Sequence, residues 1–154
     1  MYKLVILFLF LFGCQLSTGE VVKIKSSIKD VTFDVVQKKL LINADIPKEV
    51  DYLIKDWFDN HLFVNGFEGE AIINITSYNQ LLTNIKDGKK IELNLEMSIL
   101  LNKDSGLKIK KYTFNLNEFS TLTGDFNLND VDIMIKNTQT NLVNKFSSNL
   151  KSKI

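Results

Sequence analysis

The chain contains a single histidine, His61, and a single cysteine, Cys14, the residue types best suited to act as a general base and as a thiolate nucleophile. His61 falls with Trp57 and Phe58 on the inward stripe of a predicted helix, and the sequence offers it no evident serine or cysteine partner. The pattern therefore predicts a packed or boundary histidine and not a general base. The same counts exclude a zinc site built from Cys and His.

Two pairs of glutamates are the remaining candidates for acid–base chemistry, Glu68 with Glu70 and Glu92 with Glu96. Glu92 and Glu96 stand four residues apart on a predicted strand, which separates them by roughly 13 Å at 3.3–3.4 Å per residue. Even inverting glycosidases place their two carboxyl groups only roughly 6.5–9.5 Å apart. We therefore expect a solvated sheet face and a non-catalytic protein. The sequence contains no glycine-rich phosphate loop, and we expect no cofactor and no metal.

All 19 basic side chains are lysines, and they face 18 acids, a balance without the basic excess of nucleic-acid-binding proteins. Five of the lysines gather around one predicted hairpin: Lys89, Lys90, Lys108, Lys110 and Lys111. Lysines near a membrane attract anionic lipid, at about 1 kcal/mol each. Lysines on an edge strand also prevent edge-to-edge association. Two interpretations of these lysines stay open, a contact with anionic lipid or a partner, and simple edge protection.

Cys14 stands at the end of a segment with the features of an export signal. Lys3 precedes nine apolar residues, 4–12, and the small residue Gly13 comes directly before the cysteine. Nine residues are too few for a spanning helix, which needs roughly 20. They fall within the roughly 7–15 residues of a signal-peptide core. We therefore predict a signal peptide over residues 1–13, a tether over 14–20 and a single domain over 21–154.

The sequence Leu11-Phe12-Gly13-Cys14 resembles the bacterial lipobox, although Phe12 is bulkier than the usual occupant. The resemblance implies a diacylglyceryl group on the Cys14 thiol, cleavage after Gly13 and acylation of the new amino terminus. Several acyl chains give a stable anchor. Gln15 in place of a retaining Asp implies the outer membrane, with the domain facing the periplasm; a Gram-positive host would make it the cell membrane. The alternative is an ordinary secretory leader with an incidental cysteine.

Hydrophobic periodicity predicts the elements of the domain. Residues 21–42 read as one strand or as two short strands, and residues 68–78 alternate as a strand. A helix begins at Pro47 and extends to Asn65-Gly66, with Trp57, Phe58 and Phe63 in the core instead of a ligand groove. The clearest strand covers residues 91–101, where every second residue is apolar and the residues between them are polar up to Ser98.

The second half of the domain reads as a hairpin followed by a helix. Residues 103–106 form the predicted loop, and the return strand covers 107–116 with a bulge between Ile109 and Tyr112. A long amphipathic helix follows an N-cap at Asn129. The expected fold class is α+β, a two-layer sandwich in the order β-α-β-β-β-α. A mostly antiparallel sheet of about four strands carries both helices on one face, and the first helix crosses over between parallel strands.

This order of elements behind a lipobox looks like that of the small assembly lipoproteins of Gram-negative outer membranes, of the lipopolysaccharide-assembly lipoprotein type. That family usually has Gly and an aromatic residue after the lipidated cysteine, where this chain has Gln15-Leu16, so only Cys14 is carried over. The resemblance implies a non-catalytic accessory subunit in outer-membrane assembly or lipid transport, with an outer-membrane or periplasmic protein partner and lipopolysaccharide or phospholipid as its ligand. Auxiliary lipoproteins of lipid-trafficking ABC systems are equally allowed. The alternative function is a lipid-anchored small-ligand-binding protein or hydrolase, which would need a cleft of convergent ionisable groups.

Overall fold

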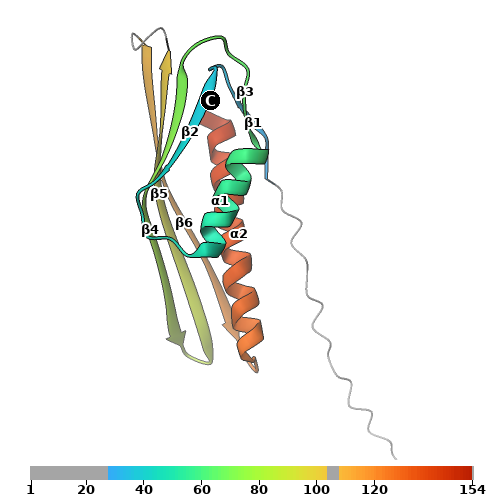
Figure 1. Cartoon of the computed structure of the whole chain (residues 1–154). Coiled ribbons are helices and arrows are strands. Elements are labelled where there is room, and N and C mark those ends of the chain that lie inside the picture. Colours follow the sequence, from blue (N-terminus) through green and yellow to red (C-terminus); the bar gives the residue numbers. More distant parts are fainter. Residues whose placement is uncertain (1–27, 104–107, 154) are drawn as a thin grey trace, which may run out of the picture.

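The computed structural model of the chain describes residues 28–103 and 108–153 (Figure 1). Four strands form one sheet in the order β2-β4-β5-β6: β2 Gln37–Ile42, β4 Glu70–Ile85, β5 Gly88–Lys103 and β6 Lys108–Thr123. β2 pairs parallel with β4, and the β4–β5 and β5–β6 pairs are antiparallel. Two short strands, β1 Val31–Phe33 and β3 Leu62–Val64, pair in parallel beside it. Cys14, the predicted signal peptide and the tether lie outside the described residues.

Both helices, α1 Lys48–Asn60 and α2 Leu128–Lys153, cover the same face of the sheet, and α2 runs along the length of the strands (Figure 1). The structure therefore confirms the predicted α+β two-layer sandwich with two helices on one face. The crossover through α1 joins parallel strands, as predicted. Neither of the helices in the described part of the chain has the length and apolarity required to span a membrane.

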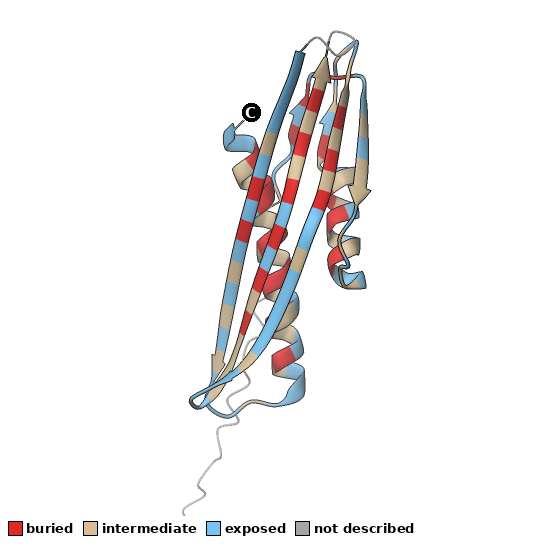
Figure 2. Cartoon of the chain, turned by 90° about the vertical axis from the view of Figure 1, so that its left-hand side faces the viewer, coloured by how far each residue is buried: buried red, intermediate tan, exposed pale blue. Residues whose placement is uncertain are grey.

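The core lies between the sheet and the helices, and strict alternation along β5 explains why it forms there. Every second residue of β5 from Ile91 to Leu101 is buried, while the residues between them face away from the helices (Figure 2). Phe146 of α2 joins three elements, because its ring lies 4.5 Å from that of Trp57 in α1 and 5.6 Å from that of Phe114 in β6. Both pairs have the edge-to-face geometry that aromatic rings prefer.

The first described residues are fixed to α2 by a buried serine. Ser147 donates a hydrogen bond to the carbonyl of Lys29 at 2.7 Å and accepts one from its N–H at 2.9 Å. The Ser147 side chain is fully buried. The chain therefore enters the domain at a fixed point on α2, directly before β1.

The first helix is shorter than predicted. It ends at Asn60, His61 caps it, and Leu62 already belongs to β3, a strand that the periodicity did not indicate. Lys38 of β2 explains the stop, because its Nζ donates to the carbonyl of Phe58 and, at 2.6 Å, to that of Leu62. Burial lowers the pKa of the Lys38 ammonium, an effect that Asp59 partly opposes. The described part of residues 21–42 forms two short strands, β1 and β2, which is the second of the two predicted possibilities.

The predicted bulge between Ile109 and Tyr112 was wrong. β6 pairs with β5 in one continuous register, so Ile109 simply faces away from the helices and is exposed. The irregularity lies in β4, between Ile75 and Ser77. It reverses the alternation of β4 and places Tyr78 on the helix-covered face, where its tip reaches α2.

The second helix begins one residue before the position predicted as its cap. Asn127, not Asn129, caps it: its Oδ1 accepts from the N–H of Asp130 at 3.2 Å, and its own N–H donates to Asp130 at 2.9 Å. This reciprocal pair satisfies two amides at the helix start. The last turn carries Lys151 and Lys153, which suits the negative end of the helix dipole.

Candidate functional site

His61 lies at the boundary of the domain, as predicted, but with an acid beside it. Its Nδ1 is 2.8 Å from Asp30 Oδ1, and the two side chains are 30% and 65% exposed. Within residues 28–103 and 108–153, no hydroxyl or thiol hydrogen-bonds to the ring. His61 therefore has an acid beside it but no nucleophile in contact. The same residues contain no group of three His, Cys, Asp or Glu side chains that could hold a metal ion.

The glutamate pairs do not form a site. Glu92 and Glu96 both face away from the helices on β5, and Glu92 forms an ion pair with Lys90. Their predicted place on a solvated sheet face is confirmed. Glu68 precedes β4 and Glu70 is its first residue. The predicted aromatic cluster also separates: Trp57 is buried in the core, whereas the core position predicted for Phe63 was wrong, because Phe63 lies in β3 and is exposed.

The five lysines around the hairpin lie at two opposite ends of the sheet. Lys110 pairs in register with Leu101, whereas Lys89 pairs with Leu122, twelve residues further along β6. At 3.3–3.4 Å per residue that separation is roughly 40 Å. Lys89 donates to Asn84 at 2.7 Å, and Lys90 pairs with Glu92 and lies 5.4 Å from the centre of the Phe119 ring. Lys89 and Lys90 therefore do not share a surface with Lys108, Lys110 and Lys111.

The fold brings two further lysines to the second group. β6 starts at the end of the sheet where α2 finishes, and Lys153 Nζ lies 4.6 Å from the centre of the Phe114 ring (Figure 1). We call this surface the basic corner; it consists of Lys108, Lys110, Lys111, Lys151 and Lys153. All five residues are exposed. In the sequence, the only indication of these two additional lysines was their position in the last turn of the predicted C-terminal helix.

The acids at this end of the sheet lie toward the other edge. Asp34 precedes β2 and pairs with Lys103 at 2.5 Å, while Glu68 and Glu70 stand at the start of β4. β2 and β6 are the two outer strands, with β4 and β5 between them. The basic corner on the β6 side is therefore a region of positive charge in a chain that is nearly neutral overall. Lysines alone can hold anions as point charges but lack the bidentate geometry of arginine.

Exposed apolar side chains accompany the lysines at this end. Ile109 lies between Lys108 and Lys110 in sequence, points to the opposite face from them and is 59% exposed. Phe67 is fully exposed in the loop before β4 and lines a cavity of about 370 Å³ together with Asp34, Glu68 and Lys103. Lys103 in turn pairs in register with Lys108. Positive charge and exposed apolar groups thus occur together at one end of the molecule.

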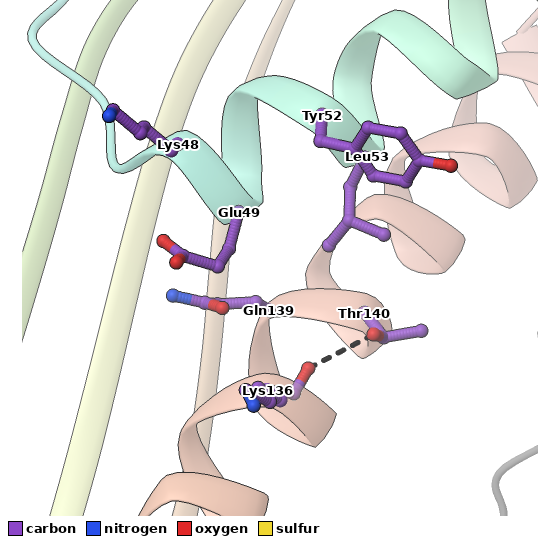
Figure 3. Close-up of a pocket in the computed structure, with 7 residues that line it drawn as sticks. All are labelled: Lys48, Glu49, Tyr52, Leu53, Lys136, Gln139 and Thr140. Carbon is purple, nitrogen blue, oxygen red and sulfur yellow. Dashed lines mark hydrogen bonds between the residues drawn. The ribbon is translucent and has the colours of Figure 1, made fainter.

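A second concave surface lies between the two helices (Figure 3). It is a groove of about 370 Å³ with Leu53 of α1 on its floor, bordered by Lys48, Glu49 and Lys136. The side chains of Glu49 and Gln139 point toward one another across it (Figure 3). Its cations stand beside a carboxylate, so the groove has no single charge preference.

The chain shares its fold with solved structures of low sequence identity. It resembles the rare lipoprotein B from Shewanella oneidensis, with a TM-score of 0.50 and 10% identity over 75% of this chain and 95% of that one. It also resembles the hypothetical protein CT253 from Chlamydia trachomatis, with a TM-score of 0.51 and 9% identity over 75% of this chain and 95% of that one. A minor lipoprotein from Acinetobacter baumannii gives a TM-score of 0.46 and 14% identity, covering 78% and 92% of the two chains.

The sequence itself matches no protein-family model and no curated protein. At these identities the structural likeness establishes the fold, and the fold is one that at least one bacterial lipoprotein has over nearly its whole length.

Proposed function

We propose that the chain is a lipid-anchored protein of the bacterial envelope that acts without catalysis, as an accessory subunit in outer-membrane assembly or lipid transport. The observation that carries the proposal is the combination of a lipobox-like Cys14 with the fold of rare lipoprotein B from Shewanella oneidensis. The two observations are independent, because the likeness in fold concerns the domain and the lipobox lies before it. In this proposal Cys14 provides the anchor, and the domain faces the periplasm.

The contacts of His61 support the choice of an accessory role over a hydrolase. A hydrolytic triad needs a nucleophile within hydrogen-bond reach of the base. His61 contacts Asp30, and the described residues place no hydroxyl on its ring. The features that stand out on the surface are a basic corner and exposed apolar side chains, which are suited to binding.

The anchor is tested by the mass of the mature amino terminus after expression in a Gram-negative bacterium and detergent extraction of its membranes. We expect a chain that begins at Cys14, carries acyl groups and fractionates with the outer membrane. The Cys14→Ser variant should lose both the acyl mass and the membrane association. A native chain that keeps residues 1–13, or that is soluble with a free thiol, contradicts the proposal.

The accessory role has its own test in the same extract. We expect the lipidated chain to co-purify with an outer-membrane protein and His61→Ala to leave this association unchanged, because His61 has no part in it. A lipidated protein that purifies as an unaccompanied monomer, under detergent conditions that preserve known outer-membrane complexes, contradicts the accessory role while leaving the anchor intact.

A further inference from the structure

We propose that the basic corner is the surface with which the folded domain lies on the anionic phospholipid surface of its own membrane. The inference rests on the proposed anchor at Cys14 and adds an orientation to it: the β5–β6 end of the sheet faces the lipid, and the β4–β5 hairpin points away. Three independent features of the described residues support it.

The first feature is charge. Lys108, Lys110 and Lys111 of β6 lie toward the end of the sheet where α2 finishes with Lys151 and Lys153, and all five are exposed. The acids at the same end, Asp34, Glu68 and Glu70, belong to the β2–β4 side of the sheet, and Asp34 is already paired with Lys103. In the sequence Asp104 follows Lys103, outside the described residues. Clustered lysines without specific geometry are suited to a diffuse layer of lipid phosphates.

The second feature is the apolar component. Ile109 is exposed on β6, among the lysines of that strand, and Phe67 and Val36 are exposed at the same end of the molecule on its β2–β4 side. The N–H of Val36 bonds the carbonyls of Glu68 and Gly69, which places it against the loop that carries Phe67. Apolar side chains next to lysines bind membranes by entering the headgroup region while the ammonium groups meet phosphates.

The third feature is reach. Ser147 fixes the entry of the chain at Lys29, and it stands six residues before Lys153, roughly 9 Å along the helix at 1.5 Å per residue. Ile28 stands fourteen positions after Cys14, a separation that spans up to roughly 46–50 Å when the chain is extended. An anchor on Cys14 can therefore be in the membrane while the basic corner touches the same surface.

The opposite end of the sheet is the natural alternative, because it also exposes apolar side chains, Leu81, Leu82 and Ile85. Its charges differ, however. Lys90 is paired with Glu92, whereas Lys89 bonds to the neutral Asn84 and keeps its charge, as does Lys86 beside Asp87. In addition, Asp125, Asp130 and Asp132 stand at the start of α2. That end therefore repels an anionic surface, and it provides an internal comparison for the test.

The orientation is tested with the full lipid-anchored protein in vesicles, labelled with an environment-sensitive nitrobenzoxadiazole at I109C or at L81C. In vesicles with phosphatidylglycerol we expect a blue shift and a rise in emission at position 109 and no change at position 81. Pure phosphatidylcholine vesicles should abolish the change at 109, as should ~1 M salt, where charges are screened beyond about 3 Å. A response at 81, or none at 109, overturns the proposal.

Charge variants separate the basic corner from overall charge. We expect the triple variant K110Q/K111Q/K151Q to lose the response at position 109. The matched triple K48Q/K86Q/K136Q removes the same charge from exposed lysines elsewhere and should keep it. Equal losses in the two triples overturn the proposal. In every case the mass of the mature amino terminus is measured on the same sample, so a failed orientation with an intact acylated Cys14 is distinguishable from a failed anchor.

Discussion

At the scale of single residues, two glycines with the same backbone conformation are in different surroundings. Gly69 and Gly124 have φ values of 84° and 86°, in the region that side chains disfavour. A Cβ at Gly69 would lie 2.2 Å from the carbonyl oxygen of Asn102 in β5, whereas one at Gly124 would meet no described atom within 4 Å. The backbone of β5 therefore limits position 69, and only the dihedral limits position 124.

Gly124→Ala should lower the free energy of unfolding by about 1–2 kcal/mol, the usual cost of a left-handed conformation. Gly69→Ala should lower it by clearly more, because the loop before β4 must also move away from β5. Urea unfolding of both variants and the parent protein measures the difference. Equal losses would show that the contact with Asn102 has no energetic weight.

Residue roles were predictable from the sequence only where neighbours along the chain decide them. The helical stripe of Trp57 and Phe58 was enough to place His61 at a boundary. Its contact with Asp30 was not predictable, because that residue is 31 positions earlier and meets His61 only through the parallel pairing of β1 and β3. For the same reason Lys153 could not be assigned to the corner with Lys110.

At the scale of elements, the strands that alternate without interruption were predicted well, and breaks in pattern were not. The bulge predicted in β6 rested on Ile109, an isoleucine that was assumed to be buried but is exposed. The true bulge in β4 was hidden, because Thr76 and Ser77 are both polar and both exposed, so no apolar residue marks the change of phase between them. The end of α1 was also hidden, since Leu62 continues the helical stripe while Lys38 and the pairing with β1 terminate it.

The contact between β4 and α2 predicts a dependence of stability on pH. Tyr78 donates to Gln80 at 2.8 Å, and Gln139 of α2 donates to the same oxygen at 3.1 Å. Burial raises the pKa of the Tyr78 hydroxyl above its ordinary value of 10.0, although a hydrogen bond with Gln139 opposes the rise. The folded state therefore favours the neutral phenol. The resulting stability is complete below pH 10.0 and is lost as the pH rises through the folded-state pKa.

Tyr78→Phe removes this ionisation, so the parent should lose more stability than the variant between a pH below 10.0 and a strongly alkaline pH. The comparison cancels the titration of the lysines, which both proteins share. Urea unfolding at the two pH values measures it. A difference between parent and variant that does not change with pH would contradict the burial of a neutral phenol at this position.

At the scale of the whole molecule, one ring connects both layers. Phe146 packs on Trp57 of α1 and Phe114 of β6, so Phe146→Ala should lower the free energy of unfolding by about 3–5 kcal/mol. Phe67→Ala removes the same side chain from a fully exposed position and should change stability by less than about 0.5 kcal/mol. Thermal and urea unfolding measure both. Similar losses would place Phe67 in a contact that the described surface lacks.

Composition also fails to predict the distribution of charge over the whole molecule. Without residues 1–13 the chain keeps 18 lysines and 18 acids, because only Lys3 is removed, and so looks neutral. The fold separates these charges: acids begin α2 and lysines end it, and β6 returns its own lysines to the same end. The two-layer sandwich was predictable from periodicity. The separation of acids and lysines between the two ends was not, because it depends on β6 and α2 running in opposite directions.

The contact between Ser147 and Lys29 has a mechanical consequence. If the anchor is pulled, tension enters the domain at Lys29 and divides between two hydrogen bonds to α2 and the parallel pair β1–β3 that follows at once. The load is thus borne by a buried serine in the last third of α2 and by short strands, and the long hairpins at either end carry none of it. With the anchor proposed at Cys14, a pull of the membrane on the domain would then leave both ends of the sheet undistorted.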